Sequence, residues 1–532
     1  MIKYPGVTHT SREAERQIPF DLAVFLIVLL AIAFRLYRID IPFVEGHSWR
    51  QVTNADITRH FAEGVMNPLL PRVSWGGLNG VVGMEFPLLH YLTAIAWRIG
   101  GESQVVARLV ATTFSIVSVI LIYILGRRLF SKPVGRGAAF LFAVSPSLVF
   151  FGRAFMSDTP MITFTLAAVI AWDWYFEQPR WSRAIVASLL TALAALVKLP
   201  AIVVLAPIGG LALSWLGWRA FKDRALWAGC AAAVALVAAW YWHADRIFLE
   251  TGLTQAVFRP SGTYPADIAP NTYFFTTYHF ATAERLLNPE FWQGMTDRFW
   301  SLHLTPPGFL GAFLGAFLAW RSGRALPVLL WALGGFTLLV VSAEGQWNHE
   351  FHQLPLLPPL ALLFGVGAAP VFDGDYLKKF MPPVLAVTAL SLILTVVSIE
   401  AFRGSNVIPG LYRTKYLTGF FVDHGNFVQS VVPPDALIIT VDYEQYGVNS
   451  PMLVYYARRQ GWSFDGATIS PRVIENLRTR YGVTFLFSSM GSKLLEPRDE
   501  LRHYLEGFEP VPLPEGLQGR LVAVDLRKPR TK

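Results

Sequence analysis

Ionisable and aromatic side chains crowd residues 39–64, IDIPFVEGHSWRQVTNADITRHFAEG, which follow directly on a long apolar run. Here the carboxylate of Glu45 lies close in sequence to His47 and Arg50. A carboxylate beside an imidazole and a guanidinium can accept a proton or help to hold an anion. Most isolated loop carboxylates only cap a helix or face solvent. Glu45 is a candidate catalytic residue because His47 and Arg50 are its neighbours in the sequence. The stretch also contains Trp49, Asp56, Arg59 and His60.

A second polar segment, GRAFMSD, contains Arg153 and Asp158. Ionisable residues are costly beside lipid, so Asp158 is a second candidate for catalysis. Arginine presents a planar pair of N–H donors that suits a phosphate, which makes Arg50 and Arg153 candidate phosphate-binding residues. Anchoring to lipid headgroups explains both arginines equally well. Further candidate cations are Lys198 and Arg259.

Two histidines, His349 and His352, are three residues apart with Glu350 between them. Across one helical turn both rings could face the same site. We favour hydrogen bonding to a substrate phosphate, or ordinary loop packing, over a cation site completed by Glu85 or His47. No cofactor is therefore predicted, and a divalent cation is the alternative left open.

The composition is that of a membrane protein. Of 532 residues 53% are hydrophobic and only 15% are charged, which excludes an ordinary soluble protein. The net charge of +8 comes from small basic groups between apolar runs, so we predict no nucleic-acid partner. The single cysteine, Cys230, excludes an intramolecular disulfide.

A bilayer core of roughly 30 Å needs about 20 mainly apolar residues per helix. On that criterion we predict about eleven transmembrane helices. They cover residues 20–37, 105–125, 137–151, 160–174, 184–197, 201–215, 226–242, 307–320, 326–341, 354–369 and 382–399. Residues 85–100 are apolar but short, and we predict an interfacial or partly inserted helix there.

Short loops rich in Lys and Arg stay cytoplasmic, and such loops alternate along this chain with eleven crossings. We therefore place the N-terminus inside and the loops 38–104 and 244–305 outside. The segments around Asp158 and His349 then face the same outer side, as does the tail. We expect residues 1–402 to form the transmembrane domain.

From about residue 403 the composition becomes that of a soluble domain. Runs at 437–443, 483–489 and 520–526 predict strands, and residues 451–460 and 471–481 predict helices between them. We expect residues 403–532 to form a small α/β domain on the outer face.

Several segments in order resemble the membrane GT-C glycosyltransferases. They read PFVEGHSWRQ, EFPLLHYL, ARLVATTFSIVSVILIYILGRRLF, AVSPSLVFFGRAFMSDTPMITF and NHEFHQLPLLPPLALLFG. Within that class the chain is most similar to the branch that contains protein O-mannosyltransferases and lipid A aminoarabinose transferases. The resemblance covers roughly residues 20–370, and no single motif in it is as specific as a zinc-ligand quartet.

The resemblance implies inverting transfer of a sugar from a polyprenyl-phosphate donor to a lipid, glycan or protein acceptor at the outer face of a bacterial inner membrane. An acidic residue of the first outer loop, usually Asp in the family, would be the base, and Glu45 matches it. Asp158 matches a second acidic position. Where the aminoarabinose transferases read Lys-Pro-Pro-Leu, this chain reads Glu85-Phe86-Pro87-Leu88, so another cation must bind the phosphate. Candidate substrate-site residues are His47, Trp49, Glu85, His90 and Tyr278.

The alternative function is a lipid or sugar transporter or flippase. Transporters tend to combine two related halves with charges at the bilayer midplane. Here the candidate charges fall at one end of the predicted spans and no halves match. A scaffold that binds lipid without turnover is a third alternative. Release of polyprenyl phosphate from a labelled lipid-linked sugar would separate all three.

Overall fold

The computed structural model describes residues 21–255, 280–323, 325–373, 419–443, 450–496 and 498–530, together with a few separate positions in the gaps. The chain divides into two compact units. The first, here called the helical unit, comprises Met1–Ile39, Arg108–Ala238 and Thr277–Pro409. The second, the mixed unit, comprises Asp40–Ala107, Ala239–Thr276 and Gly410–Lys532. Helices α5 (Gln104–Leu129) and α11 (Arg224–Thr251) run along the chain from one unit into the other.

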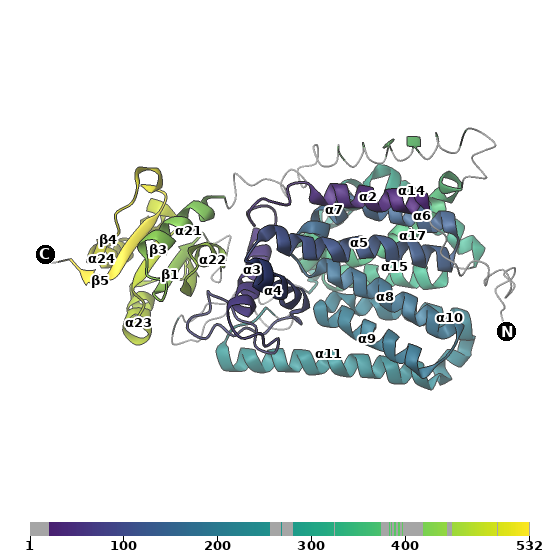
Figure 1. The fold of residues 1–532 in the computed structure, drawn as a ribbon, viewed down its shortest axis with the longest axis horizontal. Coiled ribbons are helices and arrows are strands. Elements are labelled where there is room, and N and C mark those ends of the chain that lie inside the picture. Colours follow the sequence, from purple (N-terminus) through teal and green to yellow (C-terminus); the bar gives the residue numbers. More distant parts are fainter. Residues whose placement is uncertain are drawn as a thin grey trace. The chain divides into compact units, whose positions relative to one another are not determined.

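The helical unit is a bundle of apolar helices that lie side by side (Figure 1). Its longer helices are α2 (Leu22–Leu36), α6 (Lys132–Val144), α7 (Pro146–Arg153), α8 (Asp158–Glu177), α9 (Trp181–Val197), α10 (Leu205–Leu216), α14 (Thr305–Ser322), α15 (Leu326–Val341) and α17 (Leu357–Phe372). Shorter helices connect them: η1 (Leu199–Val204), η2 (Gly217–Lys222), α12 (Ala283–Leu287), α13 (Pro289–Asp297), η3 (Arg298–His303), α16 (Ala343–Asn348) and η4 (Glu350–Leu356).

Glycines let α14 pack closely against α17. A Cβ atom at Gly315 would lie 1.7 Å from the carbonyl oxygen of Leu363, and one at Gly367 would lie 2.2 Å from that of Gly311. Gly311 and Gly315 are four residues apart, the spacing that brings helix backbones together in membranes, where no hydrophobic effect drives helices toward one another.

The first ten predicted apolar runs all fall on helices, and the eleventh, 382–399, lies mostly outside the described residues. By length and composition, four described helical segments could cross a membrane: Gln104–Leu129, Leu199–Lys222, Arg224–Thr251 and Glu350–Phe372. Two bent pairs, with breaks of 64° after α6 and 106° before α14, raise the number to six. Three shorter apolar helices are α2, α9 and α15. A polytopic helical protein is therefore confirmed, and the count of about eleven crossings stays a prediction.

The first polar stretch, predicted above as part of the outer loop 38–104, is mostly helical. Residues Ser48–Glu63 form helix α3, whose side chains are buried around most of its circumference. A helix buried on all sides lacks the apolar stripe by which helices are recognised in a sequence. The helix expected in residues 85–100 is present as α4 (Leu88–Gly100).

The C-terminal part forms the predicted α/β domain, with a five-stranded sheet in the order β2-β1-β3-β5-β4 (Figure 1). Strands β1 (Leu437–Asp442), β2 (Gln460–Asp465) and β3 (Phe485–Ser488) are parallel, whereas β4 (Phe508–Pro510) and β5 (Val522–Pro529) continue the sheet antiparallel. Its helices are α21 (Phe420–Val431), α22 (Met452–Ala457), α23 (Pro471–Tyr481) and α24 (Asp499–Glu506).

The sequence missed edge strand β2 and extended the preceding helix too far. Helix α22 ends at Ala457, followed by Arg458 with φ 50°. Strand β2 is short, and residues 74–77 cover its outer edge. The N–H of Gly77 donates to the carbonyl of Gly461 at 2.7 Å, and the N–H of Gly461 donates to that of Ser74 at 2.9 Å. Gly77 has φ +74°, and a Cβ atom there would lie 2.5 Å from the ring of Trp462.

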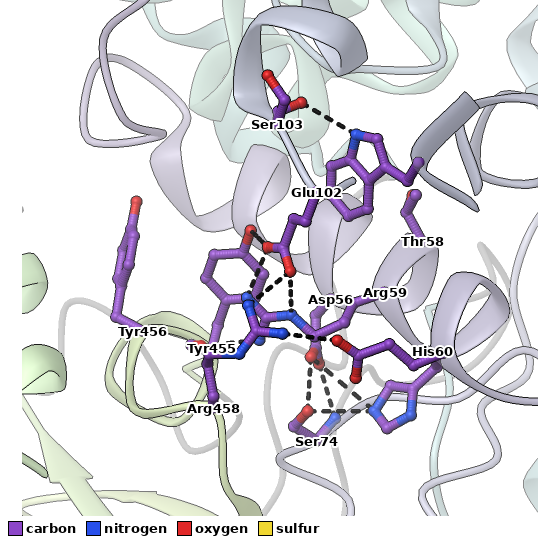
Figure 2. A network of polar contacts seen from close by, with 12 residues as sticks. Asp56, Thr58, Arg59, His60, Ser74, Glu102, Ser103, Tyr455, Tyr456 and Arg458 are labelled. Atoms are coloured by element: carbon purple, nitrogen blue, oxygen red, sulfur yellow. Dashed lines mark hydrogen bonds and ion pairs between the residues drawn. The ribbon is translucent and has the colours of Figure 1, made fainter. Parts of the chain in front are cut away.

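Ion pairs hold α22 against α3 within the mixed unit (Figure 2). The guanidinium of Arg59 donates to both oxygens of Glu102 at 2.9 and 2.7 Å and lies 3.8 Å from the ring centroid of Tyr455. Tyr455 and Arg458 also donate to Glu102, at 2.8 and 2.7 Å. Burial alone would raise the pKa of Glu102, but the hydrogen bonds and charge of Arg59, with Tyr455 and Arg458, lower it to about 2.

We expect Glu102→Gln to lower the free energy of unfolding by about 2–3 kcal/mol at pH 7, because it removes charged hydrogen bonds from Arg59 and Arg458. A carboxyl whose pKa is lower in the folded state stabilises the fold above its unfolded value of 4.5 and loses that effect as the pH falls toward 2. The difference from wild type should therefore shrink below pH 4.5. Thermal unfolding followed by tryptophan fluorescence measures it.

The matched control is Glu475→Gln. Glu475 also accepts hydrogen bonds from an arginine and a tyrosine, Arg478 and Tyr504, but its side chain is 42% exposed. Exposed pairs contribute roughly 0–1 kcal/mol, so this variant should unfold close to wild type. Equal effects of the two substitutions would show that burial of Glu102 adds nothing to the stability of the mixed unit.

Candidate functional site

Asp158 and Lys198 form a buried ion pair in the helical unit. Asp158 is the first residue of α8, and Lys198 lies between α9 and η1. The Lys198 Nζ is 2.7 Å from Asp158 Oδ1, with side-chain exposures of 12% and 1%. The second oxygen, Oδ2, is buried and accepts no hydrogen bond in the described part of the chain. The pair therefore keeps one carboxylate oxygen and part of an ammonium group available to a ligand.

The two predicted histidines lie next to this pair through Phe351. The Lys198 Nζ is 4.4 Å from the centroid of the Phe351 ring, a cation–π contact. The ring of His349 stacks on Phe351 with centroids 4.9 Å apart, and the ring of His352 is 4.5 Å away. The structure thus brings Lys198, His349 and His352 together around one aromatic ring. No pattern in the sequence singled out Phe351.

Arg153 ends α7 and is fully buried. It donates to the carbonyl of Arg38 at 3.3 Å, and its guanidinium carbon is 5.5 Å from the centroid of Phe150.

A further buried polar chain in the helical unit escaped the sequence reasoning. His303 contacts Ser147 through Nδ1 at 3.0 Å and Gln353 through Nε2 at 3.2 Å. A single histidine at the end of η3 carries no pattern that would have identified it.

Glu45 lies in the mixed unit, immediately before α3, and is 2% exposed. Its carbonyl accepts from the N–H of Ser48 at 3.0 Å, and the side chain of Gln51 donates to the carbonyl of Gly46 at 3.0 Å. His47 has φ 55° in this turn. The first turn of α3 therefore fixes the backbone that carries Glu45, which is how a carboxylate can be held in one position.

Arg50 and His90 are brought together, with Trp49 beside the arginine. Arg50 donates to Gln255 Oε1 at 3.1 Å and lies 5.4 Å from the Trp49 ring centroid. Burial, and then the charge of Arg50, lower the pKa of His90 to about 3. His90 is therefore neutral at physiological pH and can act on a ligand by hydrogen bonding only. Glu85 is half-buried just before α4. Tyr278 and Arg259 lie outside the described residues.

Asp56, Ser74 and His60 form a hydrogen-bonded array in the mixed unit (Figure 2). The N–H and the hydroxyl of Ser74 each donate to Asp56 at 2.6 Å, and His60 Nε2 is 3.1 Å from Ser74 Oγ. The single hydroxyl proton points to Asp56, so Nε2 of His60 is the donor. Burial lowers the pKa of His60 more than Asp56 raises it. The i,i+4 spacing of Asp56 and His60 was the signal available in the sequence.

Within the described ranges, no group of three or more His, Cys, Asp or Glu side chains could hold a metal ion. The histidine pair lies beside the ring of Phe351 and the ammonium group of Lys198.

The chain is similar to a family of glycosyltransferases in part of its sequence and to solved glycosyltransferases in its fold. Residues 85–242 match the family described as dolichyl-phosphate-mannose-protein mannosyltransferase. Two crystal structures of ArnT from Cupriavidus metallidurans, bound to undecaprenyl phosphate and in the apo state, are each 13% identical and cover 94% of this chain and 97% of theirs, with TM-scores of 0.62 and 0.59. No curated protein matched the sequence.

A third similar structure is the archaeal oligosaccharyltransferase AglB from Archaeoglobus fulgidus, in complex with an inhibitory peptide and a dolichol-phosphate. It is 11% identical and covers 92% of this chain and 72% of its own, with a TM-score of 0.55. At such identities these likenesses show the fold. Both relatives extend it over nearly the whole chain, including the C-terminal sheet that the family match does not reach.

We expect Lys198→Met to destabilise the protein by about 3–5 kcal/mol, because it leaves the Asp158 carboxylate buried without its cation. The double variant Lys198→Met, Asp158→Asn should be more stable than Lys198→Met alone. Thermal unfolding of the purified proteins in detergent gives both values. Lys132→Met is the control, because its partner Asp21 keeps the ion pair with Arg136. Additive effects at 158 and 198 would contradict a coupled pair.

Proposed function

We propose that this chain, whose residues 85–242 match the family described as dolichyl-phosphate-mannose-protein mannosyltransferase, is a membrane glycosyltransferase of the GT-C class that transfers a sugar from a polyprenyl-phosphate carrier to an acceptor hydroxyl. The family match carries this proposal, since its range contains both Asp158 and Lys198. The acceptor is a lipid, a glycan or a protein.

Lipid phosphates accompany the solved relatives, undecaprenyl phosphate in ArnT and dolichol-phosphate in AglB. For this chain we propose Lys198 as the cation that replaces the lysine missing at Glu85. An ammonium group has three N–H donors, and the ion pair with Asp158 leaves others for a phosphate. Asp158 holds this lysine in place. His349 and His352, on the same aromatic ring, are proposed to complete the donor-phosphate site, with Arg153 of the same unit as a further phosphate-binding residue. Arg50, in the mixed unit, is proposed separately to bind phosphate.

Glu45 is proposed as the general base. The acceptor hydroxyl gives its proton to the Glu45 carboxylate as its oxygen forms the new bond to the anomeric carbon. The bond from that carbon to the phosphate oxygen breaks, and polyprenyl phosphate leaves with the electron pair on the opposite face, so the configuration inverts. The burial of Glu45 supports this role, because exclusion of water strengthens the interactions of a carboxylate with a substrate.

We expect Glu45→Gln to lower turnover by about a hundredfold to ten-thousandfold, the usual contribution of a general base, with donor affinity and protein yield unchanged. Glu45→Asp should retain part of the activity, because the family usually has Asp at this position. The assay follows release of polyprenyl phosphate from a panel of labelled undecaprenyl-phosphate hexoses. Normal turnover of Glu45→Gln together with an inactive Asp158→Asn would assign the base to Asp158.

Arg50→Ala is the companion variant. Unlike Glu45→Gln, it is expected to weaken binding of the donor. A charged hydrogen bond to phosphate contributes about 1.5–3 kcal/mol, so donor binding should weaken at least tenfold. Arg472→Ala, an exposed arginine of α23, should leave both donor binding and turnover unchanged. Unchanged donor affinity in Arg50→Ala would remove that arginine from the phosphate-binding role.

The reaction is proposed to occur at the outer face of a bacterial inner membrane, because the basic loops alternate in that sense. In a Cys230→Ser background, we expect Gly516→Cys in the C-terminal domain to react with a membrane-impermeant thiol reagent in spheroplasts. A side chain at Gly516 meets no atom within 4 Å, so the cysteine should not disturb the fold. Lys222→Cys, exposed in η2, should be protected until the membrane is opened. The reverse labelling pattern would invert the proposed orientation.

A further inference from the structure

A cavity of about 480 Å³ lies at the C-terminal end of α3, wholly within the mixed unit. Its polar lining comes from His60, Glu63, Asn67 and Arg72, and Phe61 lies among its lining residues. The volume is in the range of roughly 300–1,000 Å³ that is usual for small-molecule sites. None of these residues has a role in the proposed transfer step, so the cavity calls for a separate account.

Ser74 and Asp56 determine the hydrogen-bonding state of His60. Its Nε2 donates to Ser74, whose own proton goes to Asp56 (Figure 2). Because burial lowers its pKa, the ring is neutral, and Nδ1 is then an acceptor without a proton. The Asp56–Ser74–His60 array thus leaves Nδ1 of His60, a residue that lines the cavity, as an acceptor rather than a group that changes its charge near pH 7.

The charges around the cavity are mixed in sign. Glu63 is a carboxylate that accepts from Arg458 at 2.6 Å, whereas Arg72 is an exposed cation. The carbonyls that end α3 would attract a cation, but Arg98 already donates to those of Phe61 and Ala62 at 3.1 and 3.0 Å. An anion would meet Glu63 and these carbonyl ends, and a cation would meet the arginines. A neutral ligand is therefore favoured over either ion.

The remaining groups select a ligand with many hydroxyls. Asn67 uses its carbonyl oxygen to accept from the N–H of Leu69 at 3.0 Å, so its amide group is left as a donor. The cavity then offers acceptors at His60 and Glu63 and donors at Asn67 and Arg72. Each hydroxyl of a sugar both donates and accepts, and the C–H face of the ring suits the apolar side chains of Phe61, Val65 and Leu70.

We propose that this cavity binds a neutral sugar ring of a glycan acceptor, at a distance along the acceptor from the hydroxyl that reacts. This inference rests on the proposed function, because it takes the ligand to be part of the acceptor. Binding energy at such a subsite positions the acceptor without entering the chemical step. The acceptor class would then be a glycan or glycolipid of at least two sugar units.

The test is saturation-transfer NMR on the purified full-length protein in a detergent without sugar headgroups, with di-N-acetylchitobiose and cellobiose as probes. Neutral disaccharides should receive saturation, and glucose 6-phosphate should bind more weakly. Arg72→Ala should weaken binding about tenfold, the effect of losing one charged hydrogen bond. Asn67→Asp keeps the acceptor for Leu69 but removes the amide donor, and should also weaken binding. Arg472→Ala is the control.

Two outcomes would overturn the proposal. A sugar site here would be excluded if no neutral disaccharide received saturation from the protein. It would also be excluded if Arg72→Ala and Asn67→Asp, in folded protein, left disaccharide binding unchanged. Displacement of the disaccharide by undecaprenyl-phosphate mannose would assign the cavity to the donor sugar. The result is independent of turnover. Disaccharide binding that both variants weaken would support the cavity even if the release assay failed, and active enzyme without disaccharide binding would leave only the transfer function.

Discussion

A charge removed from water must find its counter-charge nearby, and this constraint shapes both units. In the helical unit the constraint is met by Asp158 with Lys198, and in the mixed unit by Glu102 with Arg59. Removing one member of such a pair is far more disruptive than replacing both. The charged residues of this chain therefore cannot be understood singly, and their pairing decides which of them can act on a ligand.

The two pairs serve different ends. Glu102 is saturated: two arginines and a tyrosine donate to it, and its effect is to hold the C-terminal domain against α3. Asp158 accepts from one lysine and keeps a buried oxygen without a hydrogen bond in the described structure. A fully bonded carboxylate stabilises a fold, whereas a partly bonded one retains capacity for a substrate. This difference places Asp158, and not Glu102, among the functional candidates.

Helix α3 connects the two proposed activities of the mixed unit. Glu45, the proposed base, precedes its first turn, and the cavity for which we propose a sugar ligand lies at its last. Between these ends Asp56 and Arg59 bind Ser74 and Glu102, so the helix is tied to its neighbours along its length. A rigid element that carries a base at one end and a binding cavity at the other is a physical means of positioning an acceptor.

The amino-acid sequence by itself determined the membrane class, the apolar helices, the α/β nature of the tail and the resemblance that singled out Glu45 and Asp158. The membrane class, the apolar helices and the α/β tail follow from local patterns of apolar and β-branched residues, whereas the resemblance rests on the order of several quoted segments. Only the tertiary structure decided that residues 48–63 are a helix, that Gln460–Asp465 is an edge strand, and that Lys198 meets Asp158 and Phe351. Helix α3 is buried on nearly every side and so has no periodic stripe. Strand β2 pairs with β1 on one side, and its other edge bonds to residues 74–77, which lie almost 400 positions earlier. Partners so distant in the chain leave no trace in local spacing, because the energy that selects them arises only when each unit folds.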